Sequence, residues 1–389
     1  MEKRLVGTVI TPYRMIKQGE VAYENGKFTY VGPFRSNIHE KTEDMGDAYV
    51  APGFIDIHVH GGGGRDFAEG TPEAMLVAAK YHAQNGTAVL LPTASTSPDA
   101  VYFKFFEAYK QAVKENTEGA EMPGLHMEGP NFALAQVGAQ DPRYVIPPQK
   151  EWYENIYSKC NDILRWDVAA ERDENMEFGR WLNDRGILAS IGHSDATLEE
   201  AILAYESGYT HLTHFYSGMS ALVRRKSYRF PGLIEAGYMH NDFTVEIIAD
   251  GSHLPPSLLK HIYKAKGSDK IALITDALAE AGLPEGTISP PDAPLDRQHI
   301  IEDGVCKMLD RQCFAGSIAT TIRLVKNMVN DADCGILEAV KMMTATPAKI
   351  MGFKKKGILI PDNDADITVF STEFAPCATI VGGNTVFSK

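Results

Sequence analysis

The central part of the chain alternates short apolar runs with longer helical patterns, and this rhythm constrains the possible folds more than any other feature. We expect eight strands, at Phe54–His60, Ala88–Leu91, Gly124–Met127, Trp166–Ala169, Leu188–Gly192, His211–Phe215, Val245–Ala249 and Ile271–Thr275. Helical patterns fall between them, at Pro72–Asn85, Asp99–Glu115, Glu174–Arg185, Leu198–Glu206 and Pro256–Ala265. Eight such units over about 300 residues are typical of an α/β fold with a TIM-like (β/α)8 barrel.

A doubly wound open sheet is the alternative fold for alternating strands and helices. Such a sheet commonly carries Gly-x-Gly-x-x-Gly at its first strand-to-helix turn, where the glycines let a dinucleotide approach the backbone. The chain has no such motif at that position. The barrel is therefore the favoured architecture.

Both ends of the chain have a different pattern, in which short alternating runs are broken by glycine and proline. The clearest of these runs are Arg4–Ile10, Lys27–Val31 and Ala365–Phe370. They indicate short strands joined by tight turns. We therefore expect a small β-sandwich domain formed by residues 1–51 and 352–389, with the barrel between them at residues 52–351.

Composition excludes several classes of partner. The formal net charge of −13 argues against a nucleic-acid-binding protein, which needs a basic face. No apolar run reaches the length of a membrane span, and the first residues lack the apolar core of a signal peptide. The five cysteines are scattered without a Cys-x-x-Cys pair, which fits a reducing compartment. We expect a cytoplasmic protein that binds neither nucleic acid nor membranes, and no role for its cysteines.

The first predicted strand of the barrel ends in two histidines. Alternation along a strand places His58 and His60 on one face together with Asp56. Two neutral imidazoles on one face suit a divalent transition metal, and the glycines Gly61–Gly64 that follow leave room for a ligand. The pair alone is weak evidence, because a buried strand can carry histidines by chance.

Further polar residues follow the other predicted strands, at the end of a barrel where catalytic residues lie. They are Glu128, His193, His214, Asp250, His253 and Asp276. Each one alone also fits a turn or a helix cap. Their joint occurrence at consecutive strand ends predicts a metal-dependent active site.

Two histidines near the sixth strand compete for one position. His214 shares a strand face with Leu212, whereas His211 lies on the opposite face. We expect His214 to face the site, since it ends the strand, and His211 to pack toward a helix. His126 shares a face with Glu128 and is expected to orient a ligand by a hydrogen bond.

The motifs around these residues resemble the amidohydrolase superfamily and, within it, the N-acetylglucosamine-6-phosphate deacetylase family. The resemblance covers almost the whole chain and keeps the order of the motifs. The matching segments are Val50–Gly61, His126–Pro130, Gly192–Ala196, Ala249–His253, Ile274–Ala277, Phe314–Ser317, Thr346–Lys349, Gly357–Ile358 and Ala365–Ile367.

The resemblance implies a role for each candidate residue. Glu128, His193 and His214 would bind one divalent metal, and His58 and His60 would be available for a second ion. Asp276 would be the catalytic carboxylate, and His253 would contact the substrate near its carbonyl. Imidazole and carboxylate ligands favour zinc and also accept iron, manganese or cobalt, with one or two ions per subunit.

The implied reaction is hydrolysis of the acetamide of N-acetylglucosamine 6-phosphate, which releases acetate. Alternatives are a deacetylase of N-acetylgalactosamine 6-phosphate or another N-acyl sugar, and a different amidohydrolase such as a cyclic-amide hydrolase or a deaminase. Many of the latter bridge their metals with a carboxylated lysine, where this chain has Glu128. A barrel scaffold without catalysis is disfavoured, because all the candidate ligands and Asp276 are present.

The chain departs from the family at two places that hold the sugar phosphate. Relatives usually have Gly-Ala-His where this chain has Gly138-Ala139-Gln140, and Asn-Ala-Met where it has Ser217-Gly218-Met219. Gln140 cannot become charged as a histidine can, and Ser217 has a shorter reach than asparagine. The substrate contacts at Gln140, Ser217 and Gly218 are therefore less certain than the metal chemistry.

A phosphate also needs cations, and a run of basic residues follows His214. In the family, the phosphate arginine precedes Pro-Gly and comes from the neighbouring subunit of a dimer, which implies a homodimer here. Arg229 is the nearest match, just before Pro231-Gly232. Because guanidinium groups bind phosphate through two hydrogen bonds, Arg229 and Arg225 are preferred over Lys226.

Overall fold

Eight parallel strands form the central sheet of the computed structural model, which describes residues 2–35, 42–291 and 294–389. In order across the sheet they are β5 (Phe54–Val59), β8 (Thr87–Ala94), β9 (Leu125–Glu128), β10 (Ile163–Val168), β11 (Leu188–Ile191), β12 (Tyr209–Leu212), β15 (Thr244–Ile247) and β16 (Ile271–Leu273). Order across the sheet equals order along the chain. All eight predicted strands are present, and the predicted barrel fold is confirmed.

The first and last strands meet just beyond their ladder-forming residues. The backbone N–H and the hydroxyl of Thr275 both donate to the carboxylate of Asp56. Asp276 N–H then donates to the carbonyl of His58 at 3.0 Å, and His60 N–H donates to the carbonyl of Ala277 at 2.8 Å. Burial raises the pKa of Asp56 to about 7, against the opposing effect of the hydrogen bonds from Thr275. This seam joins the two segments that carry His58, His60 and Asp276.

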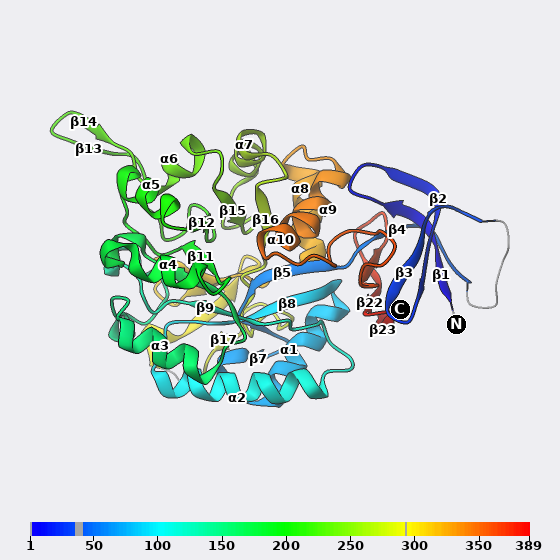
Figure 1. Ribbon diagram of the computed structural model, residues 1–389, viewed down its shortest axis with the longest axis horizontal. Helices are drawn as coiled ribbons and strands as arrows, with labels where there is room; N and C mark the ends of the chain where they lie inside the picture. Colours follow the sequence, from blue (N-terminus) through cyan, green and yellow to red (C-terminus); the bar gives the residue numbers. More distant parts are fainter. Residues whose placement is uncertain (1, 36–41, 292–293) are drawn as a thin grey trace.

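Helices cover the outside of the sheet (Figure 1). They are α1 (Pro72–Gln84), α2 (Asp99–Glu115), α3 (Lys150–Lys159), α4 (Glu177–Asn183), α5 (Leu198–Glu206), α6 (Leu233–Met239), α7 (Pro256–Lys266), α8 (Thr321–Asp331), α9 (Ile336–Met343) and α10 (Ala345–Ile350). Thr71 caps α1 through Ala74 N–H, and Thr197 and Glu200 form a capping box on α5. None of the described helices has the length and apolar content to cross a bilayer.

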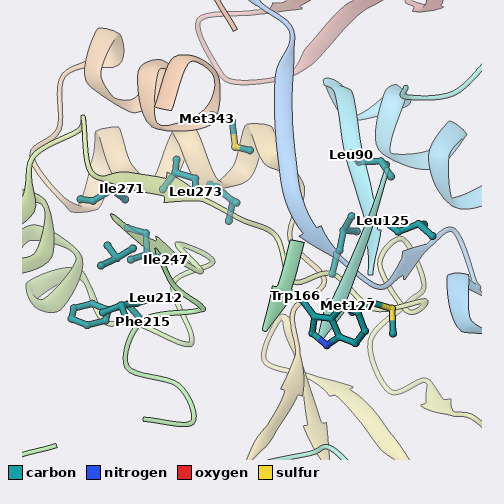
Figure 2. Packing of buried hydrophobic residues seen from close by; sticks show 14 of the residues in the cluster. Leu90, Leu125, Met127, Trp166, Leu212, Phe215, Ile247, Ile271, Leu273 and Met343 are labelled. Carbon is teal, nitrogen blue, oxygen red and sulfur yellow. The ribbon is translucent and has the colours of Figure 1, made fainter. Parts of the chain in front are cut away.

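The hydrophobic core lies between the sheet and these helices. Side chains that alternate outward from the strands, such as Leu125, Trp166 and Ile247, pack against apolar residues of the helices (Figure 2). Trp166 and Leu125 are fully buried, and the indole N–H of Trp166 donates to the carbonyl of Gly129 at 2.9 Å. The residues that alternate with these outward ones form a separate apolar cluster, which includes Val89, Leu91 and Ile274, and the polar side chains of the predicted site follow toward the carboxyl ends of the strands.

The two ends of the chain form one seven-stranded sheet beside the barrel (Figure 1). Its order is β23 (Asn384–Ser388), β22 (Pro376–Val381), β21 (Ile367–Phe370), β4 (Thr42–Pro52), β1 (Lys3–Ile10), β2 (Met15–Glu24) and β3 (Lys27–Pro33). Strand β4 pairs antiparallel with β21 and parallel with β1. The predicted small β domain from both termini is confirmed, and its boundaries at residues 52 and 352 stay predictions.

Two insertions follow strand ends and interrupt the barrel rhythm. A hairpin of β13 (Val223–Arg225) and β14 (Tyr228–Phe230) follows β12 and projects from the barrel (Figure 1). A small antiparallel sheet follows β16. Its strands are β17 (Ile288–Ser289), β18 (His299–Glu302), β19 (Val305–Met308) and β20 (Phe314–Gly316). Both insertions lie at the rim where the predicted site residues lie.

Candidate functional site

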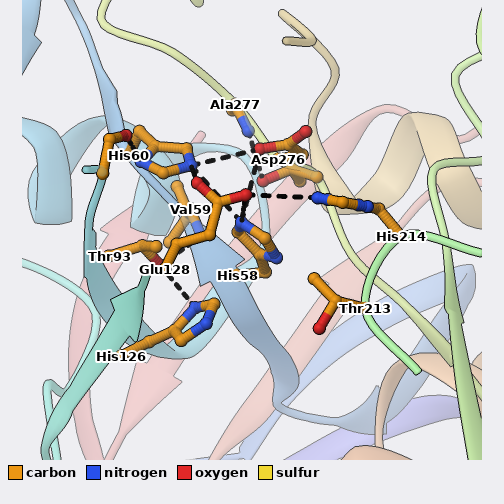
Figure 3. Close-up of polar contacts among 12 residues, drawn as sticks. His58, Val59, His60, Thr93, His126, Glu128, Thr213, His214, Asp276 and Ala277 are labelled. Atoms are coloured by element: carbon orange, nitrogen blue, oxygen red, sulfur yellow. Dashed lines mark hydrogen bonds and ion pairs between the residues drawn. The ribbon is translucent and has the colours of Figure 1, made fainter. Parts of the chain in front are cut away.

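Six predicted residues meet at the carboxyl ends of the barrel strands. They are His58, His60, Glu128, His193, His214 and Asp276, and each is at most 8% exposed. Figure 3 shows His58, His60 and His214 turned toward the carboxylate of Glu128. The structure therefore brings together residues that lie more than two hundred positions apart in the sequence, as the barrel prediction requires.

Glu128 lies at the centre of this cluster. Its Oε1 lies 3.2 Å from Nε2 of His193 and 3.1 Å from Nε2 of His214. Its Oε2 lies 3.3 Å from Nε2 of His60. The Oδ1 of Asp276 is 3.3 Å from Nε2 of His60 and 3.6 Å from Nε2 of His58. All four imidazoles thus direct Nε2 toward two carboxylates.

The other ring nitrogen of each histidine is held by a partner. Nδ1 of His193 donates to the carbonyl of Gln136 at 2.8 Å, and Nδ1 of His214 donates to the carbonyl of Ser217 at 3.1 Å. Because a carbonyl only accepts, neutral His193 and His214 carry their proton on Nδ1 and leave the Nε2 lone pair free. Nδ1 of His60 lies 3.1 Å from the hydroxyl of Ser95.

These donors fit a divalent cation. Two overlapping groups each place three ligand atoms within 4.8 Å of one another: Glu128 with His193 and His214, and Glu128 with His58 and His60. Imidazole nitrogens with one carboxylate are the donors that zinc and related metals prefer. The cluster can therefore hold one ion, or two that share Glu128.

Three residues of the cluster have a strained backbone. The φ angles of His193, His214 and Asp276 are 46°, 28° and 48°. Residues other than glycine rarely adopt this left-handed region, and each instance costs about 1–3 kcal/mol. Strain of this kind is retained where surrounding contacts hold a functional side chain in place. The strained positions lie just beyond the ends of β11, β12 and β16.

Contact between Glu128 and His214 shifts the pKa values of the two groups in opposite directions. Burial alone raises the pKa of Glu128, but hydrogen bonds from His193, His214 and His60 outweigh it and lower that pKa well below its ordinary value. Burial lowers the pKa of His214, but contact with Glu128 and the charge of Asp276 outweigh it and raise the pKa to about 9. A cation entering the cluster must therefore displace protons.

A cavity of about 900 Å³ opens above the cluster. Its floor is formed by five residues of the cluster, His60, Glu128, His193, His214 and Asp276, and residues of the small sheet β17–β20 form the opposite wall. Four predicted substrate residues, Gln140, Ser217, Gly218 and His253, line it. Nδ1 of His253 donates to the Asp250 carboxylate at 2.8 Å, which leaves Nε2 as the free ring nitrogen. This volume suits a small polar substrate.

Arg225 and Arg229 lie elsewhere. Both belong to the exposed hairpin β13–β14, which projects from the barrel (Figure 1), and neither is among the described residues that line the cavity. Arg225 lies over the ring of Phe230 within the hairpin, and Arg229 donates to the carbonyl of Ser227. The cavity of a single chain is thus built without these two predicted phosphate contacts.

Gln140 makes an unexpected contact. Its Oε1 accepts the backbone N–H of Thr96 at 2.8 Å, and its Nε2 donates to Oε2 of Glu128. Because the N–H of Thr96 can only donate, the amide of Gln140 has one possible orientation. The amide group is therefore used to hold Glu128, and this contact was not predicted from the sequence.

The prediction for His211 was wrong. Its Nδ1 lies 2.6 Å from the hydroxyl of Thr244 and its Nε2 lies 3.4 Å from Glu246, inside the barrel. The strand ends at Leu212, earlier than expected, and the left-handed backbone at His214 then turns that side chain inward. Strict alternation therefore does not extend from His211 to His214. His126 is buried beside the cluster, with its ring centroid 4.5 Å from that of His58. Its Nδ1 lies 3.1 Å from the hydroxyl of Thr93 and its Nε2 lies 2.8 Å from Asp167, so its contact with His58 is a ring contact instead of the predicted hydrogen bond.

The glycines after His60 allow close packing of the backbone and do not open a path for a ligand. A Cβ on Gly61 would lie 2.3 Å from the carbonyl of Arg65, and one on Gly62 would lie 2.6 Å from the ring of Tyr81. Within the described parts of the chain, the lining of the cavity includes none of the four glycines. The expectation that Gly61–Gly64 leave room for a ligand was wrong, because the segment at Arg65 and helix α1 fill the space beside Gly61 and Gly62.

The far wall of the cavity was missed from the sequence. Its polar residues are Arg297, His299, Lys307, Arg311, Gln312 and Cys313. The guanidinium of Arg297 donates to the carbonyls of Ala139 and Gln140, which ties this wall to the loop after β9. The Asp303-Gly304 pair between two alternating runs is a hairpin signal that could have located β18 and β19. We also expect His39 to lie in a loop or on a helix face, with a structural or exposed role, and this residue is outside the described residues.

Comparisons with known proteins agree on one family. The amidohydrolase family profile matches residues 49–386. The N-acetylglucosamine-6-phosphate deacetylase of Bacillus subtilis (strain 168) is 30% identical over 388 residues, which cover 97% of this chain and 95% of that protein. The N-acetylgalactosamine-6-phosphate deacetylase of Escherichia coli O157:H7 is 26% identical over 345 residues, 88% of each chain.

Solved structures give the same result. A mutant of the N-acetyl-D-glucosamine-6-phosphate deacetylase of Mycobacterium smegmatis, in complex with N-acetyl-D-glucosamine-6-phosphate, superposes with a TM-score of 0.91 at 25% identity and covers 100% of both chains. The N-acetylglucosamine-6-phosphate deacetylase of Pasteurella multocida gives 0.90 at 25% identity, again over 100% of both chains.

Proposed function

This chain belongs to the amidohydrolase family, and from that premise we propose that it hydrolyses the acetamide of N-acetylglucosamine 6-phosphate to glucosamine 6-phosphate and acetate. It is a hydrolase acting on carbon–nitrogen bonds, as its deacetylase relatives are. The strongest support is that four imidazoles and two carboxylates converge, and that three of those imidazoles and both carboxylates line the floor of a cavity. The scattered free cysteines support a cytoplasmic location.

In this proposal, Glu128, His193 and His214 hold one divalent ion, with zinc favoured and iron, manganese or cobalt compatible with the same donors. His58 and His60, with Glu128, form the second group of donors. When bound, such an ion activates water and polarises the amide carbonyl. The buried position of the ligands excludes bulk water, which strengthens their electrostatic interaction with the ion.

Asp276 acts as the general base and then as the general acid. Burial raises its pKa, but the charges of His58 and His60 outweigh burial and lower it, so the carboxylate is ionised at neutral pH. Its Oδ1 can take a proton from the attacking water and later deliver it to the leaving amine. His253, anchored through Nδ1 by Asp250, is the proposed substrate contact near the carbonyl. A hydrogen bond from its Nε2 to the developing oxyanion requires the imidazolium form, in which both ring nitrogens carry a proton.

Gln140, Ser217 and Gly218 are the proposed contacts to the sugar, because they line the cavity beside the cluster. Arg225 and Arg229 are kept as phosphate contacts of a homodimer, in which the hairpin of one subunit reaches the cavity of the other. The exposed position of the hairpin supports this arrangement, since it leaves both guanidinium groups at the surface.

N-acetylgalactosamine 6-phosphate is the second candidate substrate. Relatives with that specificity match this chain at 26% and 29% identity, close to the values for the glucosamine enzymes. The departures at Gln140 and Ser217 lie in the cavity wall, where a sugar hydroxyl is recognised. The two hexosamines differ at one hydroxyl, so the choice between them depends on these contacts.

Acetate release from paired substrates tests the proposal. N-acetylglucosamine and N-acetylgalactosamine would each be assayed with and without the 6-phosphate, alongside metal analysis of the purified protein. We expect bound metal and the fastest turnover on N-acetylglucosamine 6-phosphate. A faster reaction on the galactosamine substrate would select the second candidate. A metal-free protein that releases acetate from none of the four would refute both.

A further inference from the structure

A second buried polar group lies beneath the cluster, inside the barrel. At its centre is Arg165 of β10, whose side chain is fully buried. Its guanidinium donates to both oxygens of Asp167, at 3.0 and 3.2 Å, and to both oxygens of Glu246 on β15. It also donates to the hydroxyl of Thr213 at 3.0 Å and to the carbonyl of Ile57 at 3.2 Å. This group carries its own cation.

The guanidinium keeps Glu246 ionised. Both oxygens of Glu246 accept hydrogen bonds from this guanidinium, and the pairing of a buried carboxylate with a buried cation favours the ionised form. An ionised carboxylate has no proton to donate, so every hydrogen bond at Glu246 must come from its neighbours. Arg165 uses its rigid fork to fix both oxygens at once.

Glu246 also reaches upward to the cluster. Its Oε2 lies 3.4 Å from Nδ1 of His58 and 3.3 Å from the backbone N–H of His214. Its own backbone carbonyl accepts the N–H of Phe215 at 2.8 Å. One residue therefore touches the side chain of one proposed metal ligand and holds the left-handed backbone beside another.

We propose that Glu246, fixed by Arg165, is a positioning residue for the cluster. Because its carboxylate only accepts, it holds His58 with the proton on Nδ1 and the Nε2 lone pair toward Glu128 and Asp276. At His214 it retains the strained backbone that turns the imidazole inward. This role rests on the proposed function only in taking the cluster as the metal site.

Asp167 offers an internal comparison. It is as buried as Glu246 and binds the same guanidinium, but its other neighbour is His126, whose Nε2 lies 2.8 Å away. His58, His126 and Asp167 also present ligand atoms within 4.8 Å of one another. Arg165 already supplies the cation at that position, so Asp167 is expected to support the barrel without orienting a proposed metal ligand.

Glu246→Gln and Asp167→Asn form the matched test, because each removes one negative charge from Arg165 and keeps the side-chain shape. Zinc affinity would be measured by competition with a chromophoric chelator, and thermal unfolding would be measured on the metal-free protein. We expect both variants to unfold at lower temperature than the parent. Only Glu246→Gln should weaken zinc binding, by about 10- to 100-fold, as loss of a partner behind a metal ligand typically does. Equal weakening in both variants, or none in Glu246→Gln, would overturn the proposal.

A second measurement keeps the proposal testable if Glu246→Gln does not fold. Nitrogen-15 NMR of the histidines in the metal-free parent protein, assigned with a His58→Gln variant, reports which ring nitrogen of His58 carries the proton. We expect Nδ1; a proton on Nε2 alone would overturn the positioning role. A parent protein that binds no zinc and releases no acetate would instead refute the proposed function, and the NMR result would stand independently.

Discussion

The barrel interior contains two polar layers that differ in the origin of their positive charge. In the lower layer, Arg165 neutralises Asp167 and Glu246 with a side chain of the protein itself. In the upper layer, Glu128 and Asp276 are surrounded by histidines, which supply charge only when protonated. The lower layer is therefore complete when the chain folds, whereas the upper layer is completed by a cation from outside. We therefore expect the lower layer to contribute to folding stability and the upper layer to contribute to catalysis.

Asp276→Asn should have the largest effect, and that effect belongs to the upper layer alone. Loss of the carboxylate removes the proton acceptor, so turnover should fall by about 10²- to 10⁴-fold. Steady-state acetate release measures this, with metal content and thermal unfolding as controls. Asparagine keeps the shape of the side chain, so both controls should stay close to the parent. Turnover within threefold of the parent would remove Asp276 from the mechanism.

Arg165→Met should have the next largest effect, and that effect belongs to the lower layer. The change leaves Asp167 and Glu246 buried without a cation, which should reduce the free energy of unfolding by about 3–5 kcal/mol. Urea unfolding of the metal-free protein measures it. Arg165→Lys is the matched control, since it keeps the charge but loses the fork, and it should lose less. An undiminished free energy of unfolding in Arg165→Met would contradict the division into layers.

The free energy of unfolding should depend on pH differently in the two layers. We expect this effect to be smaller than that of Arg165→Met and larger than that of Arg229→Ala. Glu246 has a lowered pKa, so its contribution is present above the ordinary carboxyl range and is lost as the pH falls from that range through the lowered pKa. His214 has a raised pKa, so its contribution in the metal-free protein is present below about pH 6.5 and is lost as the pH rises through about 9.

The free energy of unfolding, measured by urea from pH 3 to pH 10 with a chelator and again with zinc, tests this difference. The alkaline loss should be about 3 kcal/mol, which follows from the difference between pKa values of 6.5 and about 9 for His214. Zinc should abolish the alkaline loss, because it binds neutral imidazoles. The acidic loss at Glu246 should persist with zinc. An alkaline loss of equal size with and without zinc would argue that the upper layer is not the metal site.

Arg229→Ala should have the smallest effect, because Arg229 lies outside both layers. We expect KM for the phosphorylated substrate to rise by about tenfold through loss of a charge-assisted hydrogen bond, and KM for the unphosphorylated sugar to change little. Lys226→Ala, in the turn of the same hairpin, is the control. An equal rise of KM on both sugars would contradict a phosphate contact.

The upper layer could be predicted from the sequence, and the lower one could not. Glu128, His193 and Asp276 follow apolar strands, and the barrel brings all strand ends together, so position along the chain was enough. Arg165 and Glu246 lie within their strands, where a charged residue between apolar ones looks like an outward, solvated position. Their pairing depends on contact across the barrel, which no local pattern contains.

The positions of the loop residues near the site also could not be predicted from local sequence patterns. The basic run around Arg229 was predicted beside the sixth strand, and it does begin there, but the path of the hairpin takes it away from the cavity of its own chain. Gln140 was expected to touch the sugar, yet its hydrogen bond to Glu128 depends on the position of Thr96 in another loop. In both cases the sequence indicated which strand end the residue follows. The direction of its side chain depends on tertiary contacts and was not predicted.

The hydrogen bonds across the seam have a consequence for redesign of this site. Asp276 N–H bonds to the His58 carbonyl, and the N–H groups of His60 and Gly61 both bond to the Ala277 carbonyl. These cross-links use backbone atoms, so they do not depend directly on the side chains at positions 58 and 60, whereas the left-handed backbone at position 276 disfavours β-branched and bulky residues there. A library that varies those side chains therefore samples new chemistry on a spacing that stays constant. Variants can then be selected for reactivity while the backbone hydrogen bonds across the seam keep the spacing of these positions.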